Sequence, residues 1–300
     1  MTADQAIEIS DRLRGHVALV TGGSQGLGRF FAIDLAKQGM RVAVMARSHG
    51  HLDETVAEIH SCGGNAMAVA ADVTDREAVE ASINSIEENL GPIDLLVNAA
   101  GHVLPVGRTW EVDPDQWWRT METNVKGTMN TCSVVARRMC PRKRGRIINV
   151  ASSTVLHGRP YMSAYMTSKT AVVKMTEILA AELDEFGVKA FSIHPGTVDT
   201  DMAKTLRRPE NAHWLRWFEE IFIKRLDNPP DLGSHLVQYL AAGNADDMSG
   251  RFFLVPLKME ETVSAFRQLA SNSKQAENAN LLRIDLLADT RPRHPAQEGI

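Results

Sequence analysis

The sequence predicts a single α/β domain built on a doubly wound parallel sheet, and three observations support this class. Short apolar runs alternate with longer helical segments along most of the 300 residues, a pattern typical of parallel strands joined by crossover helices. The apolar runs are continuous rather than alternating, as expected for strands covered on both faces. Several of the helical segments end at Gly, the usual helix stop.

The predicted strands and helices follow one another in chain order. Seven apolar runs are expected to be strands, at residues 16–22, 41–46, 65–71, 93–99, 145–151, 188–195 and 251–256. The helical segments that separate them include residues 28–39, 52–63, 76–91 and 163–187. Residues 199–245 depart from the alternation, because two or three helices are expected there with no strand between them.

The domain boundaries follow from where the alternation begins and ends. Residues 14–256 form the predicted domain, and residues 199–245 within it are the candidate substrate-binding helices or lid. Residues 1–13 form an N-terminal extension. Residues 257–300 form a polar C-terminal extension, expected to be a helix followed by a frayed tail.

Composition and charge argue against several classes of function. The net charge of -4 provides no basic field for nucleic acid, and the basic segment 137–146 is interpreted as a helix end followed by a turn. The three cysteines have no CxxC spacing, so neither a metal site nor a disulfide framework is expected, and a reducing cytoplasm fits. The first residues do not resemble a signal peptide, and no apolar window predicts a membrane span.

A glycine-rich loop joins the first predicted strand to the first predicted helix. Its sequence is VTGGSQGLG (20–28), in which Gly22, Gly26 and Gly28 permit a tight turn and close approach of a ligand to the backbone. The N-terminus of the following helix offers free N–H groups to a pyrophosphate. A turn without a ligand is the alternative for a glycine loop taken alone, but its position between a strand and a helix favours dinucleotide binding.

The end of the second predicted strand carries information about the dinucleotide. An acidic residue at this point would bind the ribose 2′-hydroxyl of NAD. Here Ala46 supplies no carboxylate, and Arg47 supplies a guanidinium suited to a phosphate. The sequence therefore favours NADP(H) over NAD(H), with an exposed surface arginine as the alternative interpretation.

Seven short motifs occur in a fixed order along the chain. They are TGGSQGLG (21–28), ADVTD (71–75), NAAG (98–101), NVKG (124–127), NVASS (149–153), YMTSK (165–169) and HPGTVDT (194–200). Together they resemble the short-chain dehydrogenase/reductase family over residues 14–256. The resemblance implies a Rossmann-like, doubly wound, seven-stranded parallel sheet in the order 3-2-1-4-5-6-7, with helices on both faces. It also implies an oxidoreductase that interconverts a ketone or aldehyde and an alcohol.

The resemblance assigns a set of residues to the cofactor. The third member of the usual N-N-A-G loop pattern is present as Ala100, whereas its second position is Ala99 instead of Asn. The chain also lacks the D-G-G that often follows the last strand of the family. The residues expected to bind the dinucleotide are Gly22, Ser24, Gln25, Gly26, Leu27, Gly28, Arg47, Ser48, Asp72, Val73, Asn98, Ala99, Gly101, Tyr165, Lys169, Pro195, Gly196, Val198 and Thr200.

The same resemblance assigns Asn124, Ser152, Tyr165 and Lys169 to catalysis. Ser152 is preferred to Ser153 because it lies thirteen residues before the tyrosine, as in relatives. The spacing of Tyr165 and Lys169 places both on one face of a helix, where the lysine cation is expected to lower the tyrosine pKa. Tyr165 is then the general acid/base, and Lys169 also binds the ribose. Ser152 orients the substrate oxygen, and Asn124 supports a proton relay.

The substrate region is less constrained by the sequence. Ser152, Tyr161, Tyr165 and Trp214 are the expected substrate contacts, and the apolar segment 211–226 is either a lid or core packing. His102 and His157 are pocket candidates, with satisfied loop histidines as the alternative. The expected substrate is a medium-sized ketone or secondary alcohol of apolar character.

Assembly and competing functions complete the expectations. By resemblance the chain is a homo-oligomer, a dimer or a tetramer, with contacts near residues 108–139 and 163–187. The main alternative is a non-catalytic dinucleotide-binding or sensor protein, and a nucleotide-sugar epimerase or dehydratase is weaker. A serine hydrolase is disfavoured because no G-x-S-x-G surrounds Ser152.

Overall fold

A seven-stranded parallel sheet forms the centre of the protein. The computed structural model describes residues 3–255, and the strand order is β3-β2-β1-β4-β5-β6-β7 with every pairing parallel. The strands are β1 Val17–Thr21, β2 Arg41–Ala46, β3 Asn65–Ala70, β4 Ile93–Asn98, β5 Arg146–Val150, β6 Lys189–His194 and β7 Phe252–Leu254. The predicted fold class, the strand order and all seven predicted strands are confirmed.

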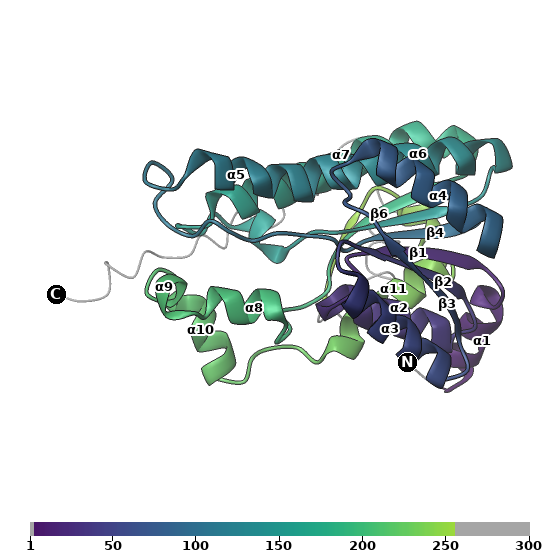
Figure 1. Ribbon diagram of the computed structural model, residues 1–300, viewed down its shortest axis with the longest axis horizontal. Helices are drawn as coiled ribbons and strands as arrows, with labels where there is room; N and C mark the ends of the chain where they lie inside the picture. The colour runs from purple at the N-terminus through teal and green to yellow at the C-terminus, as the bar shows by residue number, and fades with distance from the viewer. Residues whose placement is uncertain (1–2, 256–300) are drawn as a thin grey trace, which may run out of the picture.

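The sheet is covered by a helical layer on each face (Figure 1). One layer holds α1 Ala3–Leu13, α2 Gly26–Lys37, α3 His49–Ser61 and α11 Pro230–Ala241. The other holds α4 Arg76–Leu90, α6 Gly127–Arg142 and α7 Ser163–Leu183. Each layer buries its own apolar cluster against the sheet. The N-terminal extension contributes Ile9 and Leu13 to the first of these clusters.

The edge strand β3 differs from the central strands. All five residues of β1 are buried, whereas Asn65, Ala68 and Ala70 of β3 are exposed. A strand paired on one side only leaves part of its surface to solvent, so the expectation of coverage on both faces holds for the middle of the sheet and not for this edge.

Helices in the region 199–245 are more numerous than predicted. Four are present, namely α8 Asp201–Leu206, α9 Pro209–Ala212, α10 Arg216–Ile223 and α11. The prediction of two or three missed α9, a single turn that begins at a proline suited to a first helical position. The helices α8 to α10 lie outside the sheet layers, opposite α5 Pro114–Met121 (Figure 1), whereas α11 packs on α2 within a layer.

A π-helical turn links α5 to α6. Asp113 caps α5 by accepting a hydrogen bond from the backbone N–H of Asp115 at 2.9 Å. The π-helix spans Glu122–Lys126 and contains Asn124, and such turns are frequent at functional sites. The remaining short helices are Ser153–Leu156, Asp184–Phe186 and Asp246–Met248.

The basic segment 137–146 is a helix end and a turn, as predicted. The helix α6 ends at Arg142, and Lys143 follows in the left-handed region at φ 52°. Three arginines of the segment pair with carboxylates from neighbouring elements, including Arg146 with Asp246 at 2.7 Å. Half of the six basic side chains in the segment are therefore paired within the fold. The predicted C-terminal helix and tail lie outside the described residues.

Candidate active site

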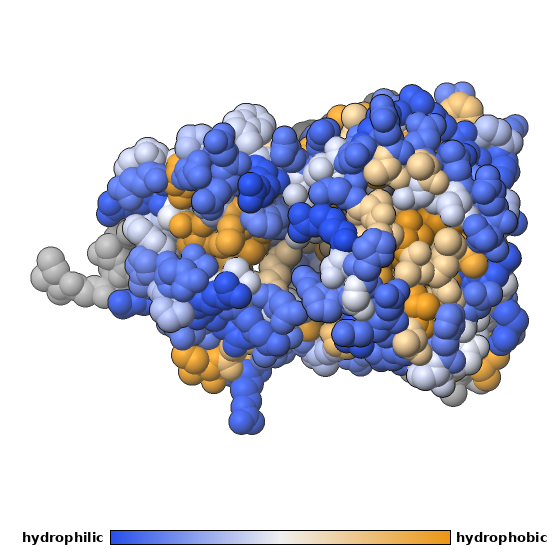
Figure 2. All heavy atoms as spheres, in the orientation of Figure 1, coloured by the Kyte–Doolittle hydropathy of each residue, from blue (hydrophilic) through white to orange (hydrophobic). Residues whose placement is uncertain are grey.

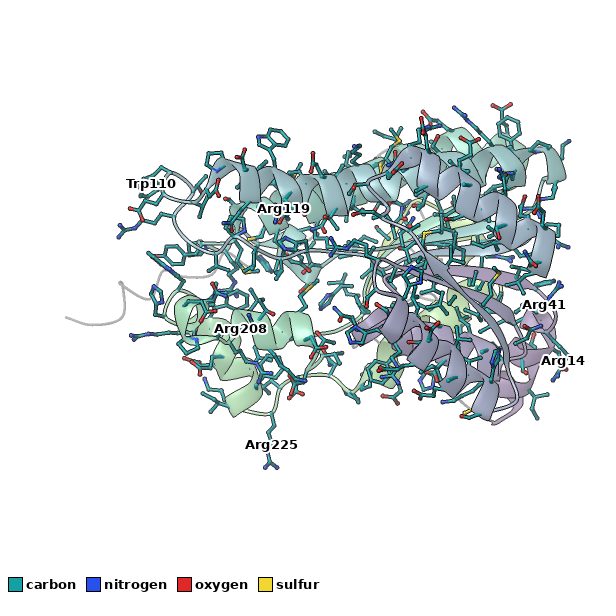
Figure 3. All side chains as sticks on the ribbon, in the orientation of Figure 1. Arg14, Arg41, Trp110, Arg119, Arg208 and Arg225 are labelled. Carbon is teal, nitrogen blue, oxygen red and sulfur yellow. The ribbon has the colours of Figure 1, made fainter. Side chains whose placement is uncertain are left out.

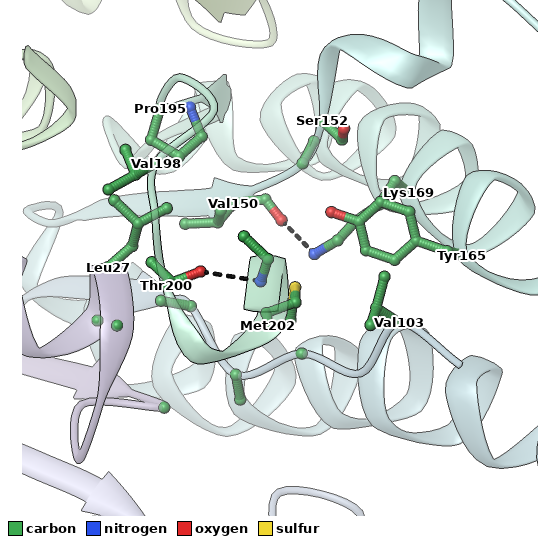
Figure 4. A pocket seen from close by; sticks show the side chains of 18 of the residues that line it. Leu27, Val103, Val150, Ser152, Tyr165, Lys169, Pro195, Val198, Thr200 and Met202 are labelled. Carbon is green, nitrogen blue, oxygen red and sulfur yellow. Dashed lines mark hydrogen bonds between the residues drawn. The ribbon is translucent and has the colours of Figure 1, made fainter. Parts of the chain in front are cut away.

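A cavity of about 840 Å³ runs along the carboxyl edge of the sheet, which is the edge where ligands bind in open α/β folds. Its lining comes from the glycine turn, from the ends of β2 to β6, and from the helices α7, α8 and α10. Figure 2 shows apolar side chains gathered in the opening at the left of the molecule, and Figure 4 shows side chains that line the cavity.

The glycine turn has no room for a side chain at Gly22 or at Gly28. A Cβ on Gly22 would lie 2.7 Å from the Cα atom of Ala100, and one on Gly28 would lie 2.3 Å from the Gly22 carbonyl oxygen. Gly22 and Gly26 also have positive φ values of 65° and 53°, which favour glycine. Gln25 makes no side-chain cap at the start of α2, so the first N–H groups of this helix stay available to an anion. All six predicted residues of the turn line the cavity.

The ends of β2 and β3 bring Arg47, Ser48, Asp72 and Val73 to the same cavity. The Arg47 side chain is 74% exposed, and its Nη1 atom lies 4.0 Å from Asp72 Oδ2. The other Asp72 oxygen accepts hydrogen bonds from the backbone N–H and the hydroxyl of Thr74 at 2.9 and 2.8 Å. Asp72 is thereby fixed in place, while the Arg47 guanidinium stays accessible to a ligand.

Asn98, one of the residues expected to bind the dinucleotide, does not line the cavity. Its Nδ2 donates to Asn149 Oδ1 at 2.9 Å, and its Oδ1 accepts from Thr131 Oγ1 at 2.7 Å. Asn149 in turn donates to Thr176 Oγ1 at 2.9 Å. The Asn98 side chain is directed toward α6 and ties the sheet to the helical layer there. The following residues Ala99 and Gly101 do line the cavity.

Tyr165 and Lys169 lie on one face of α7, as predicted from their spacing. The Lys169 ammonium is buried, donates to the Val150 carbonyl oxygen at 2.7 Å and lies 5.7 Å from the centroid of the Tyr165 ring (Figure 4). Burial lowers the pKa of Lys169 to about 8.

The pKa of Tyr165 shifts in the direction opposite to the prediction. Burial raises the pKa of Tyr165, and a hydrogen bond to Ser152 acts in the opposite direction. We expected the lysine cation to lower this pKa, but desolvation of the phenolate dominates in this structure. The protonated phenol is therefore the form that this site favours at neutral pH.

Ser152 lies beside Tyr165 at the end of β5. It is buried, and its Oγ accepts hydrogen bonds from the Thr154 backbone N–H at 3.3 Å and from the Thr154 hydroxyl at 3.0 Å. Ser152 and Ser153 both line the cavity. Of the two, Ser152 is the residue whose side chain acts to lower the pKa of Tyr165, which favours Ser152. Ser152, Tyr165 and Lys169 thus form one polar cluster in the wall of the cavity.

Asn124 is buried and does not line the cavity. Its Oδ1 accepts from the His102 backbone N–H at 2.7 Å, and its Nδ2 donates to the His102 carbonyl at 2.9 Å and to Ser168 Oγ at 2.8 Å. These bonds hold the loop after β4 against α7, next to Lys169. The side chain thus positions the loop, and both of its amide N–H groups are already bonded. Its part in a proton relay stays a prediction.

Of the two histidines expected as pocket candidates, His157 lines the cavity and His102 does not. His102 Nδ1 lies 2.9 Å from Thr120 Oγ1, and the side chain is absent from the cavity wall, so it is a satisfied loop histidine. A third histidine, His194 at the end of β6, also lines the cavity and was missed by sequence reasoning. Burial lowers the pKa of His194 to about 4.

The loop after β6 closes one side of the cavity. Pro195, Gly196, Val198 and Thr200 all line it, as predicted. Thr200 caps α8 by accepting from the Ala203 N–H at 3.3 Å (Figure 4). Asn228, which no motif identified, accepts from the Thr197 N–H at 2.9 Å and leaves no space for a side chain at Gly196.

Tyr161 and Trp214, the predicted substrate contacts besides Ser152 and Tyr165, do not line the cavity. Their rings pack on each other with centroids 4.7 Å apart, within an apolar cluster separate from the two sheet clusters. Both rings pack against side chains that line the cavity, such as Met162 and Leu206, without lining it themselves. The side chains that form the wall include Val103, Met162, Met202, Leu206, Trp217 and Phe218. Trp217 and Phe218 belong to the apolar segment 211–226 that helical spacing marked as a lid or as core packing, whereas Val103 and Met202 carry no sequence signal.

Metal and membrane features are absent from the described part of the chain. No group of His, Cys, Asp or Glu side chains in residues 3–255 is arranged to hold a metal ion. Over the same residues, every helix is too short or too polar to cross a membrane. All three cysteines are free thiols, and burial raises the pKa of Cys132 to about 12.

The sheet order, the glycine turn and the Ser–Tyr–Lys cluster define a dinucleotide-dependent oxidoreductase. The family model for short chain dehydrogenases matches residues 16–211, and the chain belongs to the short-chain dehydrogenase/reductase family. It is an oxidoreductase that acts on CH–OH groups, and its fold binds a nicotinamide dinucleotide.

Three similar proteins illustrate the relationship. A short chain dehydrogenase of Pseudocercospora fijiensis is 37% identical over 193 residues, which are 64% of this chain and 62% of that protein. A 2,3-dihydro-2,3-dihydroxybenzoate dehydrogenase of Bacillus subtilis is 33% identical over 240 residues, covering 78% of this chain and 91% of that protein. A crystal structure of an actinorhodin polyketide ketoreductase with NADPH has a TM-score of 0.75 at 32% identity, and the match covers 80% of this chain and 95% of that one.

Proposed function

We propose that the protein is an NADP(H)-dependent oxidoreductase that reduces a ketone or aldehyde, or oxidises the corresponding alcohol, with Tyr165 as the acid/base. One observation carries this proposal. Tyr165, Ser152 and the buried Lys169 come together in the wall of one cavity that also contains the glycine turn, and the Lys169 ammonium lies 5.7 Å from the centroid of the Tyr165 ring.

The residues divide the proton chemistry among them. A bound nicotinamide supplies or accepts the hydride. In the direction of reduction, Tyr165 donates its proton to the carbonyl oxygen, a role that suits its raised pKa. The Ser152 hydroxyl hydrogen-bonds the same oxygen as negative charge develops there. The Lys169 cation stabilises the phenolate that remains and binds the ribose hydroxyls. Asn124 contributes by holding the loop beside Lys169.

The dinucleotide is held mainly by backbone and by one cation. The glycine turn and the start of α2 receive the pyrophosphate. Asp72 and Val73 lie at the adenine, and the loop 195–200 lies over the nicotinamide. Arg47 is free to bind a 2′-phosphate, and no carboxylate replaces it at Ala46. The similarity to a ketoreductase solved with NADPH supports the same preference for NADP(H) over NAD(H).

We also propose a homo-oligomer, a dimer or a tetramer, that works in the cytoplasm. The helices α5, α6 and α7 expose Trp118, Met129 and Ile178 by 60%, 47% and 52%. These residues fall within the ranges expected to form subunit contacts. Sedimentation of the wild-type protein should show a dimer or a tetramer, and a monomer at every concentration would contradict this part of the proposal.

A substrate screen with both dinucleotides tests the proposed reaction. Wild-type protein should reduce part of a panel of aryl and alkyl ketones and aldehydes with NADPH, and with NADH much more slowly. Tyr165→Phe should lose turnover by at least about 1,000-fold, with NADPH affinity kept. NADPH binding without turnover of any carbonyl or alcohol would favour a non-catalytic dinucleotide-binding or sensor protein.

A further inference from the structure

Arg159 is a cation in the wall of the substrate side of the cavity. This side is lined largely by apolar residues, including Val103, Met162, Leu206 and Phe218. The charged side chains elsewhere in the cavity wall belong to Arg47 and Asp72 at the cofactor end, to the catalytic Lys169, and to Asp201, which pairs with Lys204 at 3.3 Å. Arg159 therefore needs an explanation of its own.

The position of the Arg159 side chain is set by an aromatic ring and not by an acid. Its guanidinium carbon lies 5.1 Å from the centroid of the Trp217 ring, on α10. Over residues 3–255, no Asp or Glu forms an ion pair with Arg159. By contrast, Arg108 and Arg207, which also stack on aromatic rings, both pair with carboxylates.

A stacked guanidinium without a carboxylate is suited to bind one from a ligand. Stacking occupies a face of the planar group and leaves the N–H donors at its edge available. These donors match the two oxygens of a carboxylate, which they bind as a pair of charge-assisted hydrogen bonds. The apolar walls around Arg159 lower the local dielectric constant, and the attraction is stronger there than in water.

We infer that Arg159 binds a carboxylate of the substrate, at a distance from the carbonyl that is reduced. The substrate class is then an oxo acid, or the matching hydroxy acid, with an apolar body between its two polar ends. The apolar wall contacts that body, and Ser152 and Tyr165 receive the carbonyl oxygen. This inference rests on the proposed function, because it places the reacting carbonyl at Tyr165.

Matched acids and esters test the inference. The probes are para-acetylbenzoate and benzoylpropanoate, each compared with its methyl ester, which keeps the shape and removes the charge. With NADPH, the wild-type protein should have a kcat/KM at least about 10-fold higher for the better acid than for its ester. Arg159→Met should lower the value for the acid by about 10- to 100-fold and change that for the ester by less than about 2-fold. Arg159→Lys should retain part of the preference.

Arg225→Met is the control variant. Arg225 is exposed and points into solvent away from the cavity (Figure 3), so its loss should leave both values unchanged. If Arg159→Met lowered acid and ester alike, Arg159 would only support Trp217 and the inference would be wrong. Equal turnover of acid and ester by wild type would also overturn it.

Binding measured without turnover separates this inference from the proposed reaction. Calorimetric titration of the complex with NADP⁺ should show the acids binding to wild type and to Arg225→Met, and at least about 10-fold more weakly to Arg159→Met. Acid binding that depends on Arg159, with no turnover, would support the inference and contradict the proposed function. Absence of acid binding to wild type, or binding that Arg159→Met leaves intact, would overturn the inference.

Discussion

The two ends of the cavity are built in different ways. The cofactor end consists of short backbone segments at the ends of adjacent strands, in which consecutive residues such as Ser24 to Gly28 line the wall. The substrate end consists of single side chains from distant segments, packed as a separate apolar cluster. Geometry that comes from backbone turns is encoded locally, whereas a wall made of packed side chains depends on the whole fold. The following predictions test this difference, from the largest expected effect to the smallest.

Glycine substitutions should affect the two ends very unequally. In Gly28→Ala the new Cβ would lie 2.3 Å from the Gly22 carbonyl oxygen, so the turn must move. We expect NADPH affinity to fall by at least about 100-fold and the free energy of unfolding to fall by about 2 to 4 kcal/mol. Fluorescence titration and thermal unfolding measure the two effects.

Gly158→Ala is the matched change at the substrate end. A Cβ on Gly158 would meet no atom within 4 Å. The free energies of NADPH binding and of unfolding should therefore both stay within about 0.5 kcal/mol of wild type. A Gly28→Ala protein that binds NADPH within threefold of wild type would break the proposed distinction between the two ends.

Lys169 should control the pH dependence of turnover. Its pKa, lowered to about 8, means that the cation is present below this pH and is lost above it. Reduction should therefore be flat at neutral pH and fall as the pH rises through about 8. Oxidation needs Tyr165 as a base, and because the pKa of Tyr165 is raised, its rate should increase toward alkaline pH. Initial rates in both directions measure these profiles.

Replacing Lys169 by Met should change turnover and the free energy of unfolding in opposite directions. Lys169→Met should lower kcat/KM by about 100-fold or more and remove the break near pH 8. It should also raise the free energy of unfolding at pH 7 by about 1 to 2 kcal/mol, since a buried cation is removed. In wild type, the unfolded chain binds the extra proton between about 8 and 10.5, so stability should rise with pH across that window. A lower stability of Lys169→Met would contradict the pKa direction.

Asn98 offers a test of the interior polar network. Asn98→Ala removes the donor to Asn149 and the acceptor for Thr131, and it should lower the free energy of unfolding by about 2 kcal/mol. NADPH affinity should change by less than about threefold, because the side chain does not line the cavity. Chemical denaturation and fluorescence titration measure the two effects. A large loss of NADPH affinity with an unchanged free energy of unfolding would instead show that the Asn98 side chain takes part in cofactor binding.

Arg47 should have the smallest effect and only on the choice of dinucleotide. Arg47→Met should weaken NADPH binding by about 10-fold, a modest change because the side chain is 74% exposed, and leave NADH binding nearly unchanged. High salt should reduce the difference between the variant and wild type. A wild-type preference for NADH would refute the interpretation of Arg47.

The comparison also shows what the sequence could and could not predict. The seven strands and the lining role of the glycine turn, Arg47 and the loop 195–200 follow from local pattern. The side-chain directions of Asn98 and Asn124 do not, because each depends on partners more than 20 residues away. Tyr161 and Trp214 lie behind the wall that they were expected to form. Helical spacing marks the apolar face that holds Trp214, and closeness in sequence to Tyr165 marks Tyr161, but neither signal tells which side chains reach the cavity. The direction of the Tyr165 pKa depends on burial, which no motif reports.

Transfer of deuterium tests the central claim most directly. Wild-type protein is incubated with a carbonyl substrate from the screen and with NADPH deuterated at both C4 positions, and the alcohol is analysed by mass spectrometry. The account predicts one deuterium on the carbinol carbon, and no labelled alcohol from Tyr165→Phe although this variant still binds NADPH. Alcohol formed without deuterium, or labelled alcohol formed by Tyr165→Phe at the wild-type rate, would contradict it.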